Sequence, residues 1–324
     1  MKTSLTFLTF LTFLTFPLSA KESAGTYGAA FLLIPTGVRS MGMGDAGAAL
    51  VSGSNGAVYN PAGLSRSRQA DGAFSYQDLL ADSSLNFLGY AHPIKFKGLN
   101  ELGGVTLFGN LRYVDHGKIE VNYLKADGSL DRTETLKAGQ DLALSAGYAE
   151  NFIKTYNGTH SLGVSFQMIH TSLAGQYDAQ ALGFSLGYMG NFNKLSLGLS
   201  VANLGSKIKY IEVGDPQPPV IRLGMARPFS MSTYLGVITA YDLVYEERSL
   251  HHRLGLEARL NSGLAFRGGW RLEPESFRGG PTAGFGFESE RFFLDYAFGW
   301  YGDLEATHRV LLGMTFSRFP FQRQ

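Results

Sequence analysis

The feature that most constrains the fold is a period of two in hydropathy, which recurs in most segments after residue 70. In residues 292–300, large apolar side chains occupy every second position, and Asp295, Ala297 and Gly299 fall between them. Because successive side chains of a strand point to opposite faces of a sheet, this period predicts β-strands. A soluble β-sandwich and a membrane β-barrel share the period, so the period alone leaves both possible.

The length of these segments favours a membrane barrel. We expect about fourteen strands, most of about ten residues or more, as tilted membrane-spanning strands require. Strands of soluble proteins average nearer five or six residues. The predicted strands are 70–78, 83–94, 102–124, 130–152, 158–172, 178–191, 194–204, 219–229, 231–244, 249–261, 263–273, 280–289, 291–301 and 307–317.

The connections alternate in length, as they do between the two rims of an outer-membrane barrel. Very short connections follow several even-numbered strands: 191–193, 261–262 and 289–290. Connections after odd-numbered strands are mostly longer, such as 205–218 and 274–279. With an even number of strands, the first strand begins and the last one ends at the periplasmic rim. The long segments 102–124 and 130–152 are predicted to extend above the membrane as a hairpin with residues 126–129 at its tip.

Composition supports the barrel and excludes several classes of protein. The chain has 41 Gly, 24 Phe and 16 Tyr but 11 Pro, a mixture typical of membrane barrels. After loss of Lys2, the chain has 27 basic and 27 acidic residues, so it lacks the clustered basic excess of a nucleic-acid binder. The absence of cysteine excludes disulfides, thiolate metal sites and thiol catalysis.

Residues 1–20 are predicted to be a cleaved signal peptide. Lys2 is followed by the apolar run 5–16, and small residues near Ala20 suit cleavage. A membrane anchor is the alternative, but the apolar run is shorter than the roughly twenty residues that span a bilayer. We therefore expect export to the bacterial outer membrane, with a hatch or plug segment at 21–69 and the barrel at 70–324.

The hatch segment is rich in Gly and Ala and lacks the large apolar residues needed for a core of its own. We therefore expect it to lie inside the barrel. Gly42 and Gly44 would allow tight turns in a narrow lumen. Arg39 and Asp45 could pair with inward charges of the barrel, and Pro61 would fix the entry of the chain into the first strand. A static plug and a movable gate both remain open.

Charged residues on the predicted strands should point into the lumen, since Arg or Lys on the lipid face at mid-membrane costs about 2–4 kcal/mol. Such a set can form a polar network that stiffens the barrel or a constriction that selects a solute. The candidates are Arg222, Asp242, Arg253, Glu257, Arg259, Arg267, Arg271, Asp295 and Arg309.

Catalytic and metal-binding motifs do not stand out. His251 and His252 are neighbours, so on a strand they point to opposite faces and cannot chelate one ion together. No HExxH or paired-carboxylate motif stands out. We predict a protein that is not an enzyme, with no cofactor and no catalytic or metal-ligating residue.

The N-terminal string GMGDAGAALVSGSNGAVYNPAGL resembles FadL-type barrels and, more closely, the PorV/PorQ family. Further matching segments are 28–33, 203–205, 252–257, 295–298 and 307–309. The resemblance implies a fourteen-stranded outer-membrane barrel whose N-terminal segment folds into the lumen as a hatch. It places Asn60, Pro61, Ala62 and Gly63 at the hatch motif, and the family includes components of type IX secretion.

This resemblance implies a non-enzymatic barrel that supports secretion or surface attachment of exported proteins. Its expected partners are outer-membrane lipid, secreted proteins with a C-terminal sorting domain and other secretion components, with no nucleic acid. A FadL-like channel for hydrophobic small molecules is the alternative. FadL-type uptake uses extended outer loops with an apolar groove, whereas the 205–218 loop here is polar and rich in Pro. A third possibility is an unrelated envelope role on the same fold.

Overall fold

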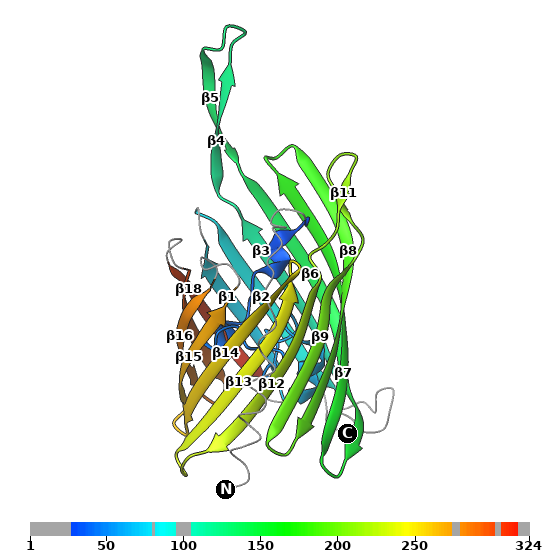
Figure 1. Cartoon of the computed structure of the whole chain (residues 1–324), viewed down its shortest axis with the longest axis vertical. Helices are drawn as coiled ribbons and strands as arrows, with labels where there is room; N and C mark the ends of the chain where they lie inside the picture. Colours follow the sequence, from blue (N-terminus) through cyan, green and yellow to red (C-terminus); the bar gives the residue numbers. More distant parts are fainter. Residues whose placement is uncertain (1–26, 80–81, 95–104, 274–278, 302–305, 317–324) are drawn as a thin grey trace.

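In the computed structural model, fourteen antiparallel strands close into a single barrel (Figure 1). The model describes residues 27–79, 82–94, 105–273, 279–301 and 306–316. Strand β1 pairs with β2 on one side and with β18 on the other, so Ala70 lies opposite Phe316 and the sheet has no free edge. The predicted all-β, fourteen-stranded barrel is thus confirmed, and the soluble sandwich is excluded. The barrel strands are β1 Ala70–Asp78, β2 Ser84–Ile94, β3 Val105–Asp115, β6 Gly139–Thr155, β7 Gly158–Leu173, β8 Tyr177–Phe192, β9 Leu195–Gly205, β12 Val220–Ser230, β13 Leu235–Glu246, β14 Ser249–Leu260, β15 Leu264–Leu272, β16 Gly280–Glu288, β17 Phe292–Trp300 and β18 Ala306–Phe316.

The two faces of the wall differ as a membrane requires. Outward side chains such as Leu88, Phe166 and Leu312 are large, apolar and more than half exposed. Most positions between them are small or polar and face the lumen, where Arg222 and Asp242 are buried. An apolar outer band and a polar interior are the pattern of outer-membrane barrels. Among the helices that the structure describes, none has the length and apolar character to span a membrane.

A two-stranded hairpin rises from the outer rim between β3 and β6 (Figure 1). Its strands are β4 Lys118–Leu124 and β5 Leu130–Lys137. The segments predicted as continuous strands are therefore each broken at the rim. Gly117 has a φ of +73° there, a conformation that a regular strand does not contain. A smaller pair, β10 Ile208–Lys209 and β11 Gly214–Asp215, lies in the connection between β9 and β12.

Strand β13 starts later than the predicted residue 231. Residues 231–234 form the turn after β12, which Met231 closes by donating its backbone N–H to the carbonyl of Leu235 at 3.0 Å. Most other boundaries agree with the prediction within a few residues, because the alternation of side chains persists to the end of each strand.

The described part of the N-terminal segment, residues 27–69, runs inside the barrel (blue in Figure 1). Its helices are short: η2 Ala30–Leu33, α2 Val38–Gly42 and η3 Pro61–Arg66. Phe31 and Leu32 of η2 join an apolar cluster with inward residues of the wall, including Phe87. The predicted signal peptide and residues 21–26 lie outside the described residues.

Candidate functional site: the occupied lumen

The N-terminal segment makes a circuit of the inner wall. Near the outer rim, Gly28 donates its backbone N–H to the carbonyl of Pro216 at 3.0 Å. Helix α2 then packs against β15, β16 and β17, and η3 packs against β6, β7 and β8. Between them, residues 43–49 pass β14 and β12, and the segment leaves at the rim where β1 begins. Both halves of the wall therefore contact it.

Inward-facing glycines on the strands admit the backbone of this segment. A Cβ on Gly198 would overlap the carbonyl of Ala48, and one on Gly187 would overlap the Asn60 side chain. The same holds at several other strands, where a Cβ would come closer than van der Waals contact to the segment. These positions are Gly163, Gly224, Gly255, Gly269 and Gly299. The high glycine content of the strands thus reflects, in part, the room that the segment requires.

Inward polar side chains of the wall accept the segment's backbone N–H groups. Asp242 Oδ2 accepts from Gly47 and Ala48 at 2.8 and 2.7 Å. Thr282 Oγ1 accepts from Gly44 at 2.9 Å. A buried backbone N–H without a partner costs free energy comparable to a lost hydrogen bond. These side chains therefore provide the hydrogen bonds that the segment's backbone does not make within a helix or sheet.

Glu257 is the centre of the ion-pair network between segment and wall. Its carboxylate is fully buried and accepts two hydrogen bonds of 2.8 Å from Arg39 of helix α2. It also accepts one of 2.7 Å from Arg267 on β15, whose Nη1 donates to Asp295 at 2.6 Å. Arg259 lies at the periplasmic end of this group and pairs with Glu288 at 2.7 Å. The predicted pairing of Arg39 with an inward charge is thus present.

The other predicted lumen charges lie in separate groups. Arg253 pairs with Glu246 and Glu273 near the outer rim. Arg271 stacks on the ring of Tyr301 at 3.8 Å and donates to the Trp300 carbonyl. Arg309 donates to the carbonyl of Pro35 in the segment at 3.1 Å, and Arg222 lies over the ring of Tyr59 at 5.4 Å. The nine predicted residues therefore share the lumen but do not form one connected cluster.

Asn60 joins two parts of the segment to the wall. Its Nδ2 donates to the carbonyls of Ala48 and Tyr188 at 2.8 and 3.0 Å. Its Oδ1 accepts from the backbone of Ala62 at 3.0 Å and so caps helix η3. Pro61 opens this helix and does not lead directly into β1, which corrects the predicted role of that proline. Ala62 and Gly63 are buried in η3, and a Cβ on Gly63 would meet Val51.

Replacing Asn60 with alanine is expected to destabilise the barrel by about 2–4 kcal/mol. The change leaves two carbonyls and one N–H without their hydrogen-bond partner, and each buried unsatisfied group costs about 1–3 kcal/mol. Urea unfolding of the refolded protein in detergent, followed by tryptophan fluorescence, measures this change. Asn122→Ala in the exposed hairpin is the matched control, since Asn122 bonds only Thr133 among its described partners. Equal midpoints for the two variants would contradict the assigned role of Asn60.

One expectation about the glycine-rich turn, that for Gly42, needs correction. Asp45 accepts a hydrogen bond from the Tyr59 hydroxyl at 3.0 Å within the segment, and its charge also interacts with the inward Arg253 of β14. Gly44 has the expected positive φ of +68°. Gly42 ends helix α2 without one, and its absent side chain permits close approach to Gly284.

Sequence reasoning missed several lumen residues because they are uncharged or lie outside the C-terminal half. Examples are Asp71, which accepts the N–H of Ser54, and Ser200, whose hydroxyl donates to the Tyr59 carbonyl. Both occupy inward positions of their strands, so the period of two could have identified them. His251 and His252 do point to opposite faces: His251 is buried beside Glu273, and His252 contacts Tyr241. No group of three or more metal-ligating side chains forms within the described ranges.

The closed wall, its apolar outer band and the segment in its lumen define a bacterial outer-membrane β-barrel of FadL-like fold. A FadL homologue from Pseudomonas aeruginosa aligns with 10% identity and a TM-score of 0.50, covering 87% of this chain and 98% of the homologue. The toluene transporter TodX from Pseudomonas putida gives 12% identity and a TM-score of 0.54, with 85% and 95% covered. At these identities the likeness shows the fold.

The family follows from the sequence. The family model described as type IX secretion system protein PorV matches residues 18–244. The chain therefore belongs to the PorV family, as its N-terminal motif indicates. A search of curated protein sequences finds no match.

Proposed function

We propose that this barrel is a non-catalytic outer-membrane component that supports the secretion or surface attachment of exported proteins. Membership of the PorV family, whose described role is type IX secretion, supports this proposal. The observation that carries it is the occupied lumen: the segment is bonded to the wall by Asp242, Glu257 and Asn60. A barrel filled in this way suits a scaffold better than a pore.

The hatch role of residues 27–69 belongs to the same proposal. The segment contributes buried side chains and backbone hydrogen bonds on both halves of the wall, so it stabilises the barrel as a plug. Partners would then bind outside the lumen, at the rims or at the lipid-facing wall. Secreted proteins with a C-terminal sorting domain are the expected cargo, together with other secretion components.

A native pull-down tests this function. The tagged barrel, extracted in mild detergent from the outer membrane of its source, should recover secreted proteins that share a C-terminal domain. Recovery of bulk porins alone would contradict the proposal.

FadL-like uptake of hydrophobic small molecules is the alternative, and the lumen disfavours it. The inner wall carries buried charged groups such as Arg222, Arg253 and Glu257 in place of a continuous apolar lining. Liposomes containing the purified protein should therefore admit a labelled fatty acid no faster than empty liposomes. Accelerated entry would favour uptake over secretion.

The β4–β5 hairpin provides a prediction about partners. Two-stranded hairpins alone are at best marginally stable in water, so a hairpin that projects from the rim gains little from the barrel itself. Replacing residues 118–137 with a short Gly-Ser turn should leave barrel unfolding within about 1 kcal/mol of the parent, while recovery of partners in the pull-down falls severalfold. Unchanged recovery with an intact barrel would show that the hairpin is dispensable for partner binding.

A further inference from the structure

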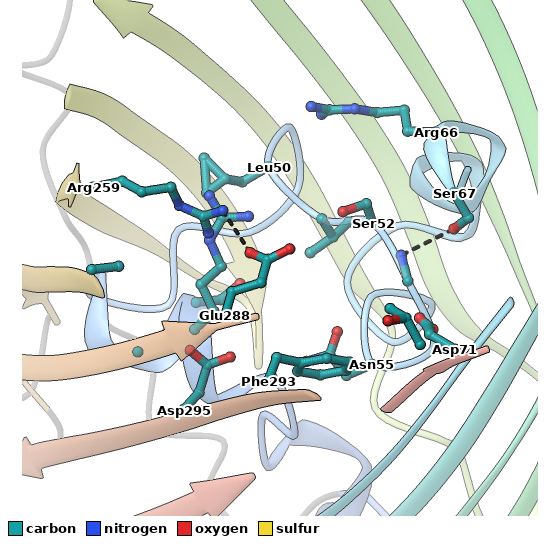
Figure 2. A pocket seen from close by; sticks show the side chains of 18 of the residues that line it. Leu50, Ser52, Asn55, Arg66, Ser67, Asp71, Arg259, Glu288, Phe293 and Asp295 are labelled. Carbon is teal, nitrogen blue, oxygen red and sulfur yellow. Dashed lines mark hydrogen bonds and ion pairs between the residues drawn. The ribbon is translucent and has the colours of Figure 1, made fainter. Parts of the chain in front are cut away.

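A cavity of about 420 Å³, lined by charged and apolar residues, lies between the N-terminal segment and the periplasmic ends of the barrel strands (Figure 2). Its lining includes Arg259 at the end of β14, Glu288 at the end of β16 and Thr315 at the end of β18. The segment contributes the opposite side with Leu50, Ser52 and residues 66–68. We call this space the periplasmic vestibule. Its volume is in the range of small-molecule sites, roughly 300–1,000 Å³.

The lining carries more arginines than carboxylates. It includes five arginines and three carboxylates, and each carboxylate already has a partner. Glu288 pairs with Arg259 at 2.7 Å and Asp295 with Arg267 at 2.6 Å. Asp71 accepts the backbone N–H of Ser54 at 2.8 Å. Glu257, buried just outside the lining, pairs with both Arg39 and Arg267, so four carboxylates balance five arginines and one positive charge remains in excess.

The excess lies at Arg66 and Arg68. Arg66 ends helix η3, and its guanidinium bonds neutral groups, the Ala49 carbonyl at 3.3 Å and the Met189 sulfur at 3.8 Å. Arg68 follows two residues later, and both side chains are exposed to the vestibule side. Figure 2 shows Arg66 and Arg259 entering the cavity from different elements. Arg259 also keeps a buried Nε without a hydrogen bond, at 3.5 Å from Glu257.

We propose that the periplasmic vestibule is a binding site for an oxyanion group, a carboxylate or a phosphate, presented from the periplasm. Guanidinium groups form short, charge-assisted and often bidentate hydrogen bonds with both oxyanions. Arg66 and Arg68 supply the charge, and Arg259 adds a donor from the opposite side. Leu50 and Phe293 give the same cavity an apolar surface, so a carboxylate attached to an apolar group fits it best. The free C-terminal end of a polypeptide has this chemistry. The site does not depend on whether the barrel serves secretion or uptake.

Calorimetry on the detergent-solubilised full chain tests the site with three probes. These are an acetylated neutral tetrapeptide with a free C-terminal carboxylate, the same peptide with an amidated end, and inorganic phosphate. We expect the free acid to bind at least tenfold more tightly than the amide. Binding of phosphate in competition with the acid would identify a general oxyanion site, and acid binding without phosphate binding would identify a peptide end. Equal binding of acid and amide, or no binding of acid and phosphate, would overturn the proposal.

The double variant Arg66→Gln/Arg68→Gln should lose at least tenfold in affinity for whichever oxyanion binds. Arg291→Gln is the matched control, because Arg291 lies in a turn at the same rim but outside the cavity lining. The heat-dependent gel shift of a folded barrel monitors folding. If the double variant fails to fold, Arg68→Gln alone should still weaken binding severalfold. Unchanged affinity in a folded Arg68→Gln and a folded double variant would contradict the assignment.

Discussion

Replacing Gly198 with valine is expected to displace the N-terminal segment from the lumen. A Cβ at this position overlaps the Ala48 carbonyl, which is backbone and cannot move aside as a flexible side chain could. Ala48 is also held by Asp242 and Asn60, so a shift there breaks several buried hydrogen bonds together. Overpacking alone costs about 1–3 kcal/mol, and the lost bonds add about 1–3 kcal/mol each. The expected destabilisation is therefore about 3–6 kcal/mol.

Urea unfolding measures this loss, and limited proteolysis reports whether residues 27–69 become accessible in the folded barrel. The control is Gly268→Val, since a Cβ on Gly268 meets no atom within 4 Å and points to the lipid side. It should unfold like the parent and protect the segment. Equal protection of the segment in both variants would contradict the close fit between the glycines and the segment.

The Glu257→Gln variant is expected to lose about 3 kcal/mol or more of folding free energy. The carboxylate is fully buried and neutralises Arg39 and Arg267 together. Removing one partner of a buried ion pair typically costs 3–5 kcal/mol, because the remaining charge stays desolvated. We expect the loss at the lower end of this range, since the Arg39 side chain is 25% exposed and Arg267 still pairs with Asp295. The same fluorescence-detected unfolding measures it, with Trp270 and Trp300 as reporters.

The control for this variant is Glu288→Gln. Glu288 also pairs with an arginine, but its side chain is 56% exposed, and exposed pairs contribute about 0–1 kcal/mol. The double variant Arg39→Gln/Glu257→Gln should recover part of the loss, because it removes one of the two arginines that Glu257→Gln leaves without its carboxylate partner. A Glu257→Gln variant no less stable than Glu288→Gln would show that the network does not tie the segment to the wall.

The barrel could be predicted from sequence because a period of two persists along each strand. The period assigns every side chain to one of two faces, and once strand length indicates a membrane barrel, Leu312 is placed outside and Arg309 inside. The period does not say how deep in the membrane a residue lies, nor which residue of the next strand it faces. The break at Gly117 was missed for this reason, since alternation continues through the hairpin above the rim.

The connections within the lumen were harder to predict. Glu257 faces Arg267 directly in the register of β14 and β15, so that pair follows once register is known. Its bond to Arg39 joins residues 218 positions apart and depends on where helix α2 rests against the wall. Asp45 likewise depends on the placement of the segment, since it accepts a hydrogen bond from Tyr59 and interacts with the charge of Arg253 on β14. The high number of glycines on the strands is visible in the sequence. That many of them make room for the N-terminal segment is visible only in the structure.

Conductance in planar bilayers tests most directly whether the lumen is closed by its own N-terminal segment. The intact protein should show no steady channel, whereas Gly198→Val, with its segment displaced, should show stable open steps. Stable porin-like steps from the intact protein, unchanged in Gly198→Val, would contradict the account of a filled lumen.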